Sequence, residues 1–227
     1  MRPQPVYNES GIQIYCGDCR DILPHIEAVD LVLTDPVWGI EGGKGGNRKA
    51  GKALYNQIGW DDTENYVRTT CVPIIEQCIY KFKRVIVTPG IRCLWFYPRP
   101  DDMGCFWTPA AMGFGSWGYI SFSPILYYGK DPRAGVGQFP NGKTVTEIAE
   151  KNGHPCPKPI KAWTWLLNKG SNEGEIILDP FMGSGTTLVA AKSLGRKAIG
   201  IEIEPKYVDI AIKRLQQEYF DFTLALK

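Results

Sequence analysis

Nearly continuous apolar runs alternate along the chain with segments whose apolar positions recur at helical spacing. The strand-like runs lie at residues 12–16, 28–34, 84–88, 119–122, 175–178 and 198–203. The helix-like segments lie at residues 67–82, 161–167, 186–194 and 205–219. Strands that alternate with helices in this way predict an α/β fold with a mainly parallel sheet.

The remaining segments are less regular. Pro73 falls inside the first helix-like segment, where it is expected to kink the helix or to mark its first turn. The polar, glycine-containing stretch at 131–153 predicts an inserted loop region with one short helix at 145–151. Residues 222–226 predict a last edge strand. Because no linker divides the chain, we expect one domain over residues 1–227.

Composition narrows the class of protein. The 227 residues are 44% hydrophobic, which suits one α/β domain with a full core. The net charge is only +2, so a nucleic-acid partner has to be argued from local charge. The N-terminus lacks a long apolar run, which predicts no signal peptide and no membrane span. Seven cysteines without regular spacing indicate reduced thiols and a cytoplasmic location, and no second pair accompanies Cys16 and Cys19 to form a metal site.

A glycine-rich loop at residues 179–187 follows one strand-like run. Gly183 and Gly185 lack Cβ atoms, so a ligand can approach the backbone closely there. Thr186 and Thr187 then open a helix whose free N–H groups face the ligand. At the end of the next strand, Glu202 is placed to accept hydrogen bonds from a ribose diol.

Two common phosphate-binding loops do not match this sequence. Leu188 stands where a dinucleotide fingerprint has its third glycine, and no lysine follows Gly185 as it would in a P-loop. The loop together with the acidic strand end therefore predicts a nucleoside-type cofactor.

A second motif, Asp35-Pro36-Val37-Trp38, follows the strand-like run at 28–34. An exocyclic amine of a nucleobase is a poor nucleophile because its lone pair is delocalised into the ring. The carboxylate of Asp35 and the carbonyl of Pro36 can each accept one N–H of such an amine and direct its lone pair outward. Trp38 offers a flat face on which the base can stack, provided that the base leaves the duplex.

These motifs in this order resemble the DNA amino-methyltransferases that make N6-methyladenine or N4-methylcytosine, in the group whose catalytic motif precedes the cofactor motif. The resemblance covers most of the chain outside 131–153. It is carried by Gly17-Asp18-Cys19, Thr34 to Ile40, Gly59-Trp60-Asp61, His154 to Pro159, Asp179 to Thr187, and Gly200-Ile201-Glu202 with Pro205 and Tyr207.

The resemblance implies an S-adenosylmethionine-dependent methyltransferase (Rossmann-like) fold, a seven-stranded and mostly parallel sheet in permuted order, and methyl transfer to adenine N6 in DNA. Asp35, Pro36 and Trp38 would hold the target amine and base. The implied cofactor-binding residues are Asp18, Lys158, Asp179, Phe181, Gly183, Ser184, Gly185, Thr186, Thr187 and Glu202. The implied partner is double-stranded DNA with a flipped target base, bound by a monomer or homodimer.

Two departures from the family pattern keep alternatives open. Val37 stands where a second proline is usual, and Trp38 where tyrosine is more common. A catalytically weakened DNA-binding relative is therefore one alternative. Asp35 favours adenine N6, while cytosine N4 or an RNA base amine are the others. The room for target recognition is also small and lies mostly within residues 93–153.

Two further features bear on DNA. The glycine-rich loop at 39–52 is expected to act as a lid that touches DNA phosphates through its basic residues, which are Lys44, Arg48, Lys49 and Lys52. Trp95, Trp107 and Trp117 are expected to lie mostly in the core, with one of them able to stack on a displaced base.

Overall fold

The computed structural model describes residues 2–40, 61–110, 113–137 and 139–224. The contacts within the chain divide it into two compact units, of which unit 1 comprises residues 1–34 and 149–227 and unit 2 comprises residues 35–148. The predicted organisation as one domain with an insertion at 131–153 stays a prediction. The predicted cationic lid falls largely on residues 41–60, so its four basic residues lie outside the described part of the chain.

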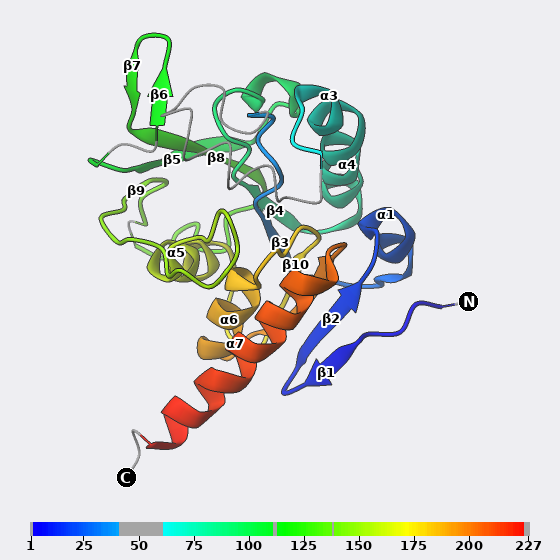
Figure 1. Ribbon diagram of the computed structural model, residues 1–227. Helices are drawn as coiled ribbons and strands as arrows, with labels where there is room; N and C mark the ends of the chain where they lie inside the picture. The colour runs from blue at the N-terminus through cyan, green and yellow to red at the C-terminus, as the bar shows by residue number, and fades with distance from the viewer. Residues whose placement is uncertain (1, 41–60, 111–112, 138, 225–227) are drawn as a thin grey trace. The chain divides into compact units, whose positions relative to one another are not determined.

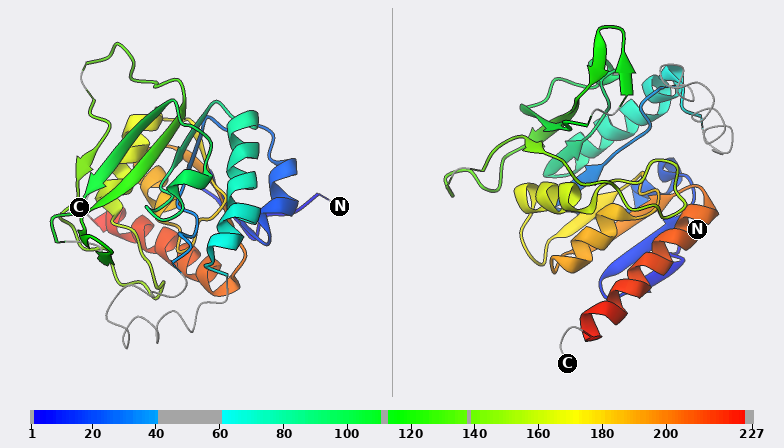
Figure 2. Two further views of the ribbon diagram at one scale, coloured as in Figure 1. Left: turned by 90° about the horizontal axis from the view of Figure 1, so that it is seen from above. Right: turned by 60° about the vertical axis from the view of Figure 1, so that its left-hand side comes forward.

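Unit 1 contains a sheet with the order β1-β2-β11-β10-β3. Its strands are β1 (Tyr7–Glu9), β2 (Ile12–Cys16), β3 (Leu31–Thr34), β10 (Ile176–Asp179) and β11 (Lys197–Glu202). The pairs β2–β11, β11–β10 and β10–β3 are parallel, and β1 is antiparallel to β2 (Figures 1 and 2). The carboxyl ends of these parallel strands therefore meet at one edge of the sheet, where the two strand-end motifs of unit 1 lie.

The helices of unit 1 pack on this sheet and on one another. They are α1 (Cys19–Ile22), the 3₁₀ turn η1 (Leu23–His25), α5 (Ile160–Gly170), α6 (Thr186–Ser193) and α7 (Pro205–Leu224). Helix α6 contacts α5, α7, β10 and β11. Its Leu188 and Val189 are buried together with Leu178 and Ile201 of the sheet, so α6 is a core helix.

The predicted edge strand at 222–226 is wrong as far as the description reaches, because α7 continues to Leu224. A five-residue apolar run fits either a strand or a helix, whereas an established helix gains one backbone hydrogen bond for each residue added. The longer periodic pattern before it, with buried Val208, Ala211 and Leu215, thus determines the structure of this end.

Unit 2 contains a second set of strands with the order β4-β8-β5-β9. These are β4 (Arg84–Val87), β5 (Asp102–Trp107), β8 (Phe122–Gly129) and β9 (Lys143–Thr144). Strand β8 is antiparallel to both β4 and β5, and β9 is parallel to β5. A separate antiparallel hairpin, β6 (Gly113–Gly115) with β7 (Gly118–Ile120), stands out from β5 and β8 (Figures 1 and 2).

The predicted helix around Pro73 is present, with a local change in winding. Helix α3 (Glu64–Tyr66) leads into a π-helical turn, η2 (Val67–Cys71), and then into α4 (Val72–Lys81), where Pro73 lies in the first turn. The N–H of Val72 donates to the carbonyl of Val67, five residues back. Since proline has no N–H and its ring crowds the preceding turn, the wider winding before it avoids a conflict. A short 3₁₀ turn, η3 (Leu94–Phe96), follows β4.

Most predicted elements are confirmed within one to three residues. The strands behind the prediction of a seven-stranded sheet, β2, β3, β4, β5, β8, β10 and β11, are all present, and the short β1 and β9 lie beside β2 and β5. The predicted helix at 145–151 is wrong. Val145 instead continues the extended course of β9, and its N–H donates to the carbonyl of Trp107 at 2.7 Å. That long-range pairing replaces the local bonds of a helix.

Candidate functional site

The glycine loop of unit 1 is fixed by the end of β11. The N–H of Met182 donates to the carbonyl of Ile201 at 3.1 Å, and the N–H of Gly183 donates to Oε2 of Glu202 at 2.9 Å. Gly183 and Gly185 have φ angles of +51° and +77°, in the left-handed region that favours glycine. The loop and Glu202, predicted separately from the sequence, therefore lie in direct contact.

Close packing behind the loop gives a second reason for its glycines. A Cβ at Gly185 would lie 2.8 Å from Cβ of Ala211, and one at Gly183 would lie 3.0 Å from Nε2 of His154. The sequence argument attributed both glycines to the approach of a ligand. The structure adds that helix α7 and His154 leave no room for a side chain at either position.

Asp179 is a buried hub beneath the loop. Its Oδ1 accepts hydrogen bonds from the hydroxyl of Thr34 at 2.7 Å and from the N–H of Phe181 at 3.1 Å. Its Oδ2 accepts from the hydroxyl of Thr187 at 2.5 Å, and that hydroxyl also accepts from Nε1 of Trp163 at 3.1 Å. Asp179 is 3% exposed. Both Asp179 and Thr187 thus hold the loop in shape, and Thr34 is a member of this network that the sequence argument did not single out.

Arg214 of α7 is a second residue that the sequence argument missed. Its Nη1 donates to the carbonyl of Ser184 at 2.6 Å and to the hydroxyl of Thr186 at 3.2 Å. The side chain is 11% exposed, and Nη2 lies 3.8 Å from the carboxylate of Glu150. Ser184 itself accepts a hydrogen bond from Asn152 at 3.1 Å. A sequence signal existed only as one basic residue in a long helix, which is usually solvated.

Glu202 carries the most perturbed carboxylate of the site. Its Oε2 accepts from Gly183 and its Oε1 accepts from the N–H of Glu204 at 2.8 Å. Burial raises the pKa of Glu202 to about 7, and the charge of Asp179 adds to this, although the two backbone N–H groups oppose it. Each carboxylate oxygen has a further lone pair, so Glu202 has the acceptor capacity that ribose hydroxyls require. The residues present therefore fit a nucleoside cofactor at this end of β11.

Asp18 lies next to Glu202, because Cys16 pairs with Glu202 and the N–H of Gly17 donates to the carbonyl of Glu202 at 2.9 Å. The carboxylate of Asp18 accepts from the N–H of Arg20 at 2.8 Å, which caps α1, and from Nη2 of Arg20 at 2.5 Å. Hydrogen bonding to Arg20 lowers the pKa of Asp18. Asp18 is therefore held as an anion at the carboxyl end of β2.

Lys158 lies in the segment between β9 and α5, close enough to His154 for its charge to lower the pKa of that imidazole. Burial is the main cause of that shift, which brings the pKa of His154 to about 4. Nδ1 of His154 accepts from the N–H of Cys156 at 3.1 Å, and the ring meets Tyr207 edge-on at 4.5 Å. His154 is thus a packed, neutral residue with a backbone bond, as its sequence context predicted.

The Asp-Pro-Val-Trp motif is held within unit 2. The hydroxyl of Thr88 donates a short hydrogen bond to Oδ1 of Asp35. Nε1 of Trp38 donates to the carbonyl of Thr88 at 2.9 Å and to Oδ1 of Asp35 at 3.2 Å. Pro36 is buried, whereas Asp35 and Trp38 are half-buried. Thr88 therefore fixes both the predicted carboxylate and the predicted stacking ring, although the sequence showed it only as a strand end.

Asp62 supports the backbone of the same motif. It is 8% exposed, and its Oδ1 accepts the N–H of Gly39 at 2.8 Å. Further backbone hydrogen bonds from Trp38 and Ile40 lower its pKa, but burial outweighs them and raises it. The neighbouring Asp61, which belongs to the motif used for the resemblance, is exposed and accepts from the N–H of Thr63 at 3.0 Å. The buried member of this acidic pair is thus the one that holds the motif.

Two general searches apply to the described residues only. Among residues 2–40, 61–110, 113–137 and 139–224, no helix has the length and apolar character needed to cross a membrane. Within the same ranges, no group of three His, Cys, Asp or Glu side chains is arranged to hold a metal ion.

The parallel sheet of unit 1, with its glycine loop and acidic strand end, and the Asp-Pro-Val-Trp motif of unit 2 define the class of α/β methyltransferase-like proteins. The sequence model described as "DNA methylase", for the N6- and N4-amino group of enzymes, matches residues 98–213, which is half of the chain. The chain belongs to this DNA methylase family, and the predicted family is thereby confirmed.

Curated relatives agree with this family. Over 262 aligned residues the chain is 25% identical to the type II methyltransferase M.ScaI of Streptomyces caespitosus, covering 95% of this chain and 84% of that protein. A shorter match, 51% identical over 77 residues, links it to the type II methyltransferase M2.DpnII of Streptococcus pneumoniae, with 33% of this chain and 29% of that protein covered. The chain therefore matches less than a third of M2.DpnII.

Solved structures show the same fold. The PvuII DNA methyltransferase (cytosine-N4-specific) superposes with a TM-score of 0.69 at 16% identity, covering 93% of this chain and 89% of that one. The M1.HpyAVI–SAM complex superposes with a TM-score of 0.61 at 21% identity, covering 90% and 99%. The predicted S-adenosylmethionine-dependent methyltransferase fold is thereby confirmed, and the prediction of S-adenosylmethionine as cofactor is confirmed at the level of family and fold.

Proposed function

We propose that the protein transfers a methyl group from S-adenosylmethionine to the exocyclic N6 amine of adenine in double-stranded DNA. The observation that carries this proposal is the way in which Asp35 is held. Its Oδ1 accepts hydrogen bonds from Thr88 and Trp38, so the carboxylate has a fixed orientation directly beside the carbonyl of Pro36. A pair of fixed acceptors is what an amine with two N–H groups requires.

Unit 1 is the proposed cofactor half. Glu202 would accept the ribose hydroxyls, and Asp18 would accept the amino group of the adenine, displacing or sharing the exposed guanidinium of Arg20. Phe181, Gly183, Ser184, Gly185 and Thr186 would line the methionine end, with Lys158 near its carboxylate. Asp179 and Thr187 would act as positioning residues, because their polar atoms bond to the loop itself and to its supports.

When bound, S-adenosylmethionine supplies an electrophilic methyl group on a positively charged sulfur. Asp35 and Pro36 accept the two N–H groups of the target amine, which draws the nitrogen lone pair out of conjugation with the ring. The carboxylate of Asp35 also stabilises the positive charge that develops on the nitrogen and gives its proton a route to solvent. Trp38, whose indole is oriented by Thr88, stacks on the base after it has left the duplex.

Cytosine N4 is the second candidate, and one observation favours it. The PvuII enzyme, whose structure superposes on the chain with a TM-score of 0.69, is cytosine-N4-specific. Adenine and cytosine present the same amine geometry to two acceptors, so Asp35 serves either base. The aspartate at position 35 is the feature that favours adenine N6 in this family.

The test is to incubate the purified protein with S-adenosylmethionine and unmethylated DNA, digest the DNA to nucleosides, and quantify modified bases by mass spectrometry. We expect N6-methyladenine, reduced by about a hundredfold or more in Asp35→Asn. Asparagine keeps one oxygen to accept from Thr88 and Trp38, but it presents an NH₂ group where the amine needs an acceptor.

Cofactor binding by Asp35→Asn, measured by calorimetry, serves as the control and should match that of the wild type. N4-methylcytosine as the product would replace adenine by the second candidate. Cofactor binding with methylation of RNA but not of DNA would reject both, and cofactor binding without any methylated nucleic acid would identify a DNA-binding relative disabled at Val37.

A further inference from the structure

Unit 2 carries an aromatic surface that the proposed chemistry does not use. Trp117, Tyr119, Trp107 and Phe122 are 102%, 71%, 49% and 43% exposed. We call these four residues the aromatic hairpin surface, because they belong to the β6–β7 hairpin and to the facing ends of β5 and β8. The prediction that Trp107 and Trp117 lie mostly in the core is wrong, and Trp95, at 84% exposed, departs from it as well.

Trp117 occupies the most prominent position on this surface. Gly115 pairs with Gly118, so Ser116 and Trp117 form a two-residue turn at the tip of the hairpin. Gly118 has a φ angle of +127°, and a Cβ built there would have no atom within 4 Å. An indole that is as exposed as in an extended chain, on a hairpin that projects from its sheet, has the shape of a wedge (Figure 1).

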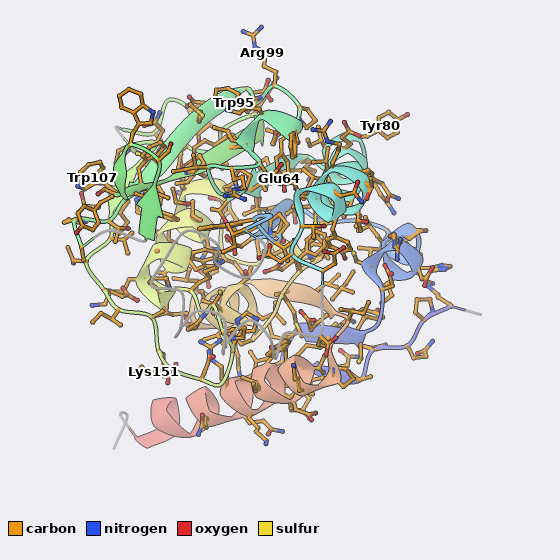
Figure 3. The ribbon with its side chains drawn as sticks, turned by 45° about the horizontal axis from the view of Figure 1, so that its top comes forward. Glu64, Tyr80, Trp95, Arg99, Trp107 and Lys151 are labelled. Carbon is orange, nitrogen blue, oxygen red and sulfur yellow. The ribbon has the colours of Figure 1, made fainter. Side chains whose placement is uncertain are left out.

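The base of the hairpin continues the same chemistry. Trp107 and Phe122 face each other in the β5–β8 register, so their side chains adjoin the strands that lead into and out of the hairpin. Trp107 lies on the outside of unit 2 in Figure 3. Exposed aromatic rings at both the tip and the base provide several flat faces on one protruding element.

The charges around this surface favour a polyanion as its partner. Residues 103–129 contain no charged side chain, and the basic residues Lys130, Arg133 and Lys143 follow, with Asp131 as the sole acidic residue between 103 and 146. Lys143 pairs with Phe106 in the β9–β5 register, next to Trp107. Apolar rings beside positive charges fit nucleic acid, in which stacked bases are flanked by phosphates.

We propose that the aromatic hairpin surface binds DNA, with Trp117 inserted against base faces at or beside the position that the target base vacates. This inference rests on the proposed action on DNA and adds a specific contact to it. A protein partner fits the surface less well, because stable protein interfaces bury roughly 800 Å² on each side and a two-residue turn between three-residue strands presents a narrow tip.

The test measures the affinity for a fluorescein-labelled 40-base-pair duplex of random sequence by anisotropy at fixed salt. Stacking of one aromatic ring on a base corresponds to roughly a 5- to 150-fold change in affinity, and we expect Trp117→Ala to weaken binding within that range. Trp117→Phe, which keeps a flat ring, should recover most of the affinity. Trp95→Ala is the matched control, because Trp95 is also highly exposed but lies apart from the hairpin, in η3 (Figure 3), and should bind as the wild type does.

Equal duplex affinities of Trp117→Ala and the wild type would overturn the proposal. A change in oligomeric state in sedimentation velocity, with DNA affinity unchanged, would overturn it in favour of self-association. The proposed methyl transfer is scored separately on the same proteins. Methylation by the wild type with an unaltered KM for DNA in Trp117→Ala would reject the hairpin contact alone. Duplex binding that depends on Trp117, without any methylated base, would reject the methyl transfer alone.

Discussion

The indole of Trp38 lies where a side chain at residue 90 would begin. A Cβ built on Gly90 would stand 2.6 Å from Cγ of Trp38, and Gly90 has a φ angle of +66°. The residues after β4 thus shape the Asp-Pro-Val-Trp motif twice, since the Thr88 carbonyl accepts from the indole and Gly90 leaves room for it. The candidate catalytic motif is therefore a product of two chain segments that are about fifty residues apart.

The first prediction concerns Gly90→Ala. The added methyl group has to displace the Trp38 ring, and the left-handed backbone adds strain, so we expect a loss of roughly 2–6 kcal/mol in the free energy of unfolding. Gly174→Ala is the matched control, because Gly174 also has a positive φ angle, +78°, but a Cβ there meets nothing within 4 Å. Denaturant unfolding compares the two variants. Equal losses would contradict a packing role for Gly90.

The second prediction concerns Asp62→Asn. Asparagine keeps one oxygen for the N–H of Gly39, but its NH₂ group opposes the other backbone N–H donors near Asp62. We expect about 1–3 kcal/mol less stability and a lower kcat, because the backbone of Trp38 and Gly39 loses its anchor.

Affinity for S-adenosylmethionine should stay at the wild-type value in Asp62→Asn, since the proposed cofactor residues belong to unit 1 and Asp62 to unit 2. Asp61→Asn provides the control at an exposed neighbour and should leave all three quantities unchanged. Loss of cofactor affinity in Asp62→Asn would contradict this separation of roles.

The third prediction concerns Arg214, proposed as a positioning residue for the glycine loop. Arg214→Met keeps the aliphatic stem but removes the donors to the Ser184 carbonyl and the Thr186 hydroxyl. Hydrogen bonds from charged donors contribute roughly 1.5–3 kcal/mol, so we expect KM for S-adenosylmethionine to rise by about tenfold to a hundredfold.

In steady-state kinetics, KM for DNA should change little in Arg214→Met, and Arg214→Lys should restore part of the cofactor affinity because lysine can donate to the carbonyl. Lys213→Met, at the exposed neighbouring position of α7, should behave as the wild type does. If Arg214→Met lowers stability and both KM values stay as they were, the arginine has a purely structural role.

The fourth prediction concerns pH and Glu202. Its pKa of about 7 in the folded protein lies above the value of an unburied glutamate, so the folded protein binds this proton more tightly than the unfolded chain. The stabilisation from this proton is present in full below about pH 4.5 and is lost as the pH rises through about 7. Cofactor affinity should change in the opposite direction, because ribose hydroxyls donate to the ionised carboxylate.

Between pH 5.5 and 8, wild-type stability relative to Glu202→Gln should therefore decrease, while the affinity of the wild type for S-adenosylmethionine increases. Thermal unfolding and calorimetric titration across that range measure the two trends. An affinity that is as steep with pH in Glu202→Gln as in the wild type would assign the titration to another group.

The sequence by itself determined the features that depend on neighbouring residues. Apolar runs placed β2, β4, β10 and β11 closely, because the cores of buried strands are written in consecutive side chains. The glycine loop and Glu202 were identified because residues with special backbone or acceptor properties occur at strand ends. The family followed from the order of these motifs.

Only the tertiary structure decided the features that depend on partners distant along the chain. Residues 145–151 extend a strand edge because the Trp107 carbonyl accepts from Val145, which no local pattern records. Thr88, Asp62 and Arg214 support the candidate site because folding brings them to Asp35, Gly39 and Ser184. Trp117 is exposed because a two-residue turn places it at the tip of a hairpin. Hydrophobicity alone assigns such a side chain to the core, whereas its exposure is fixed by which strands pair.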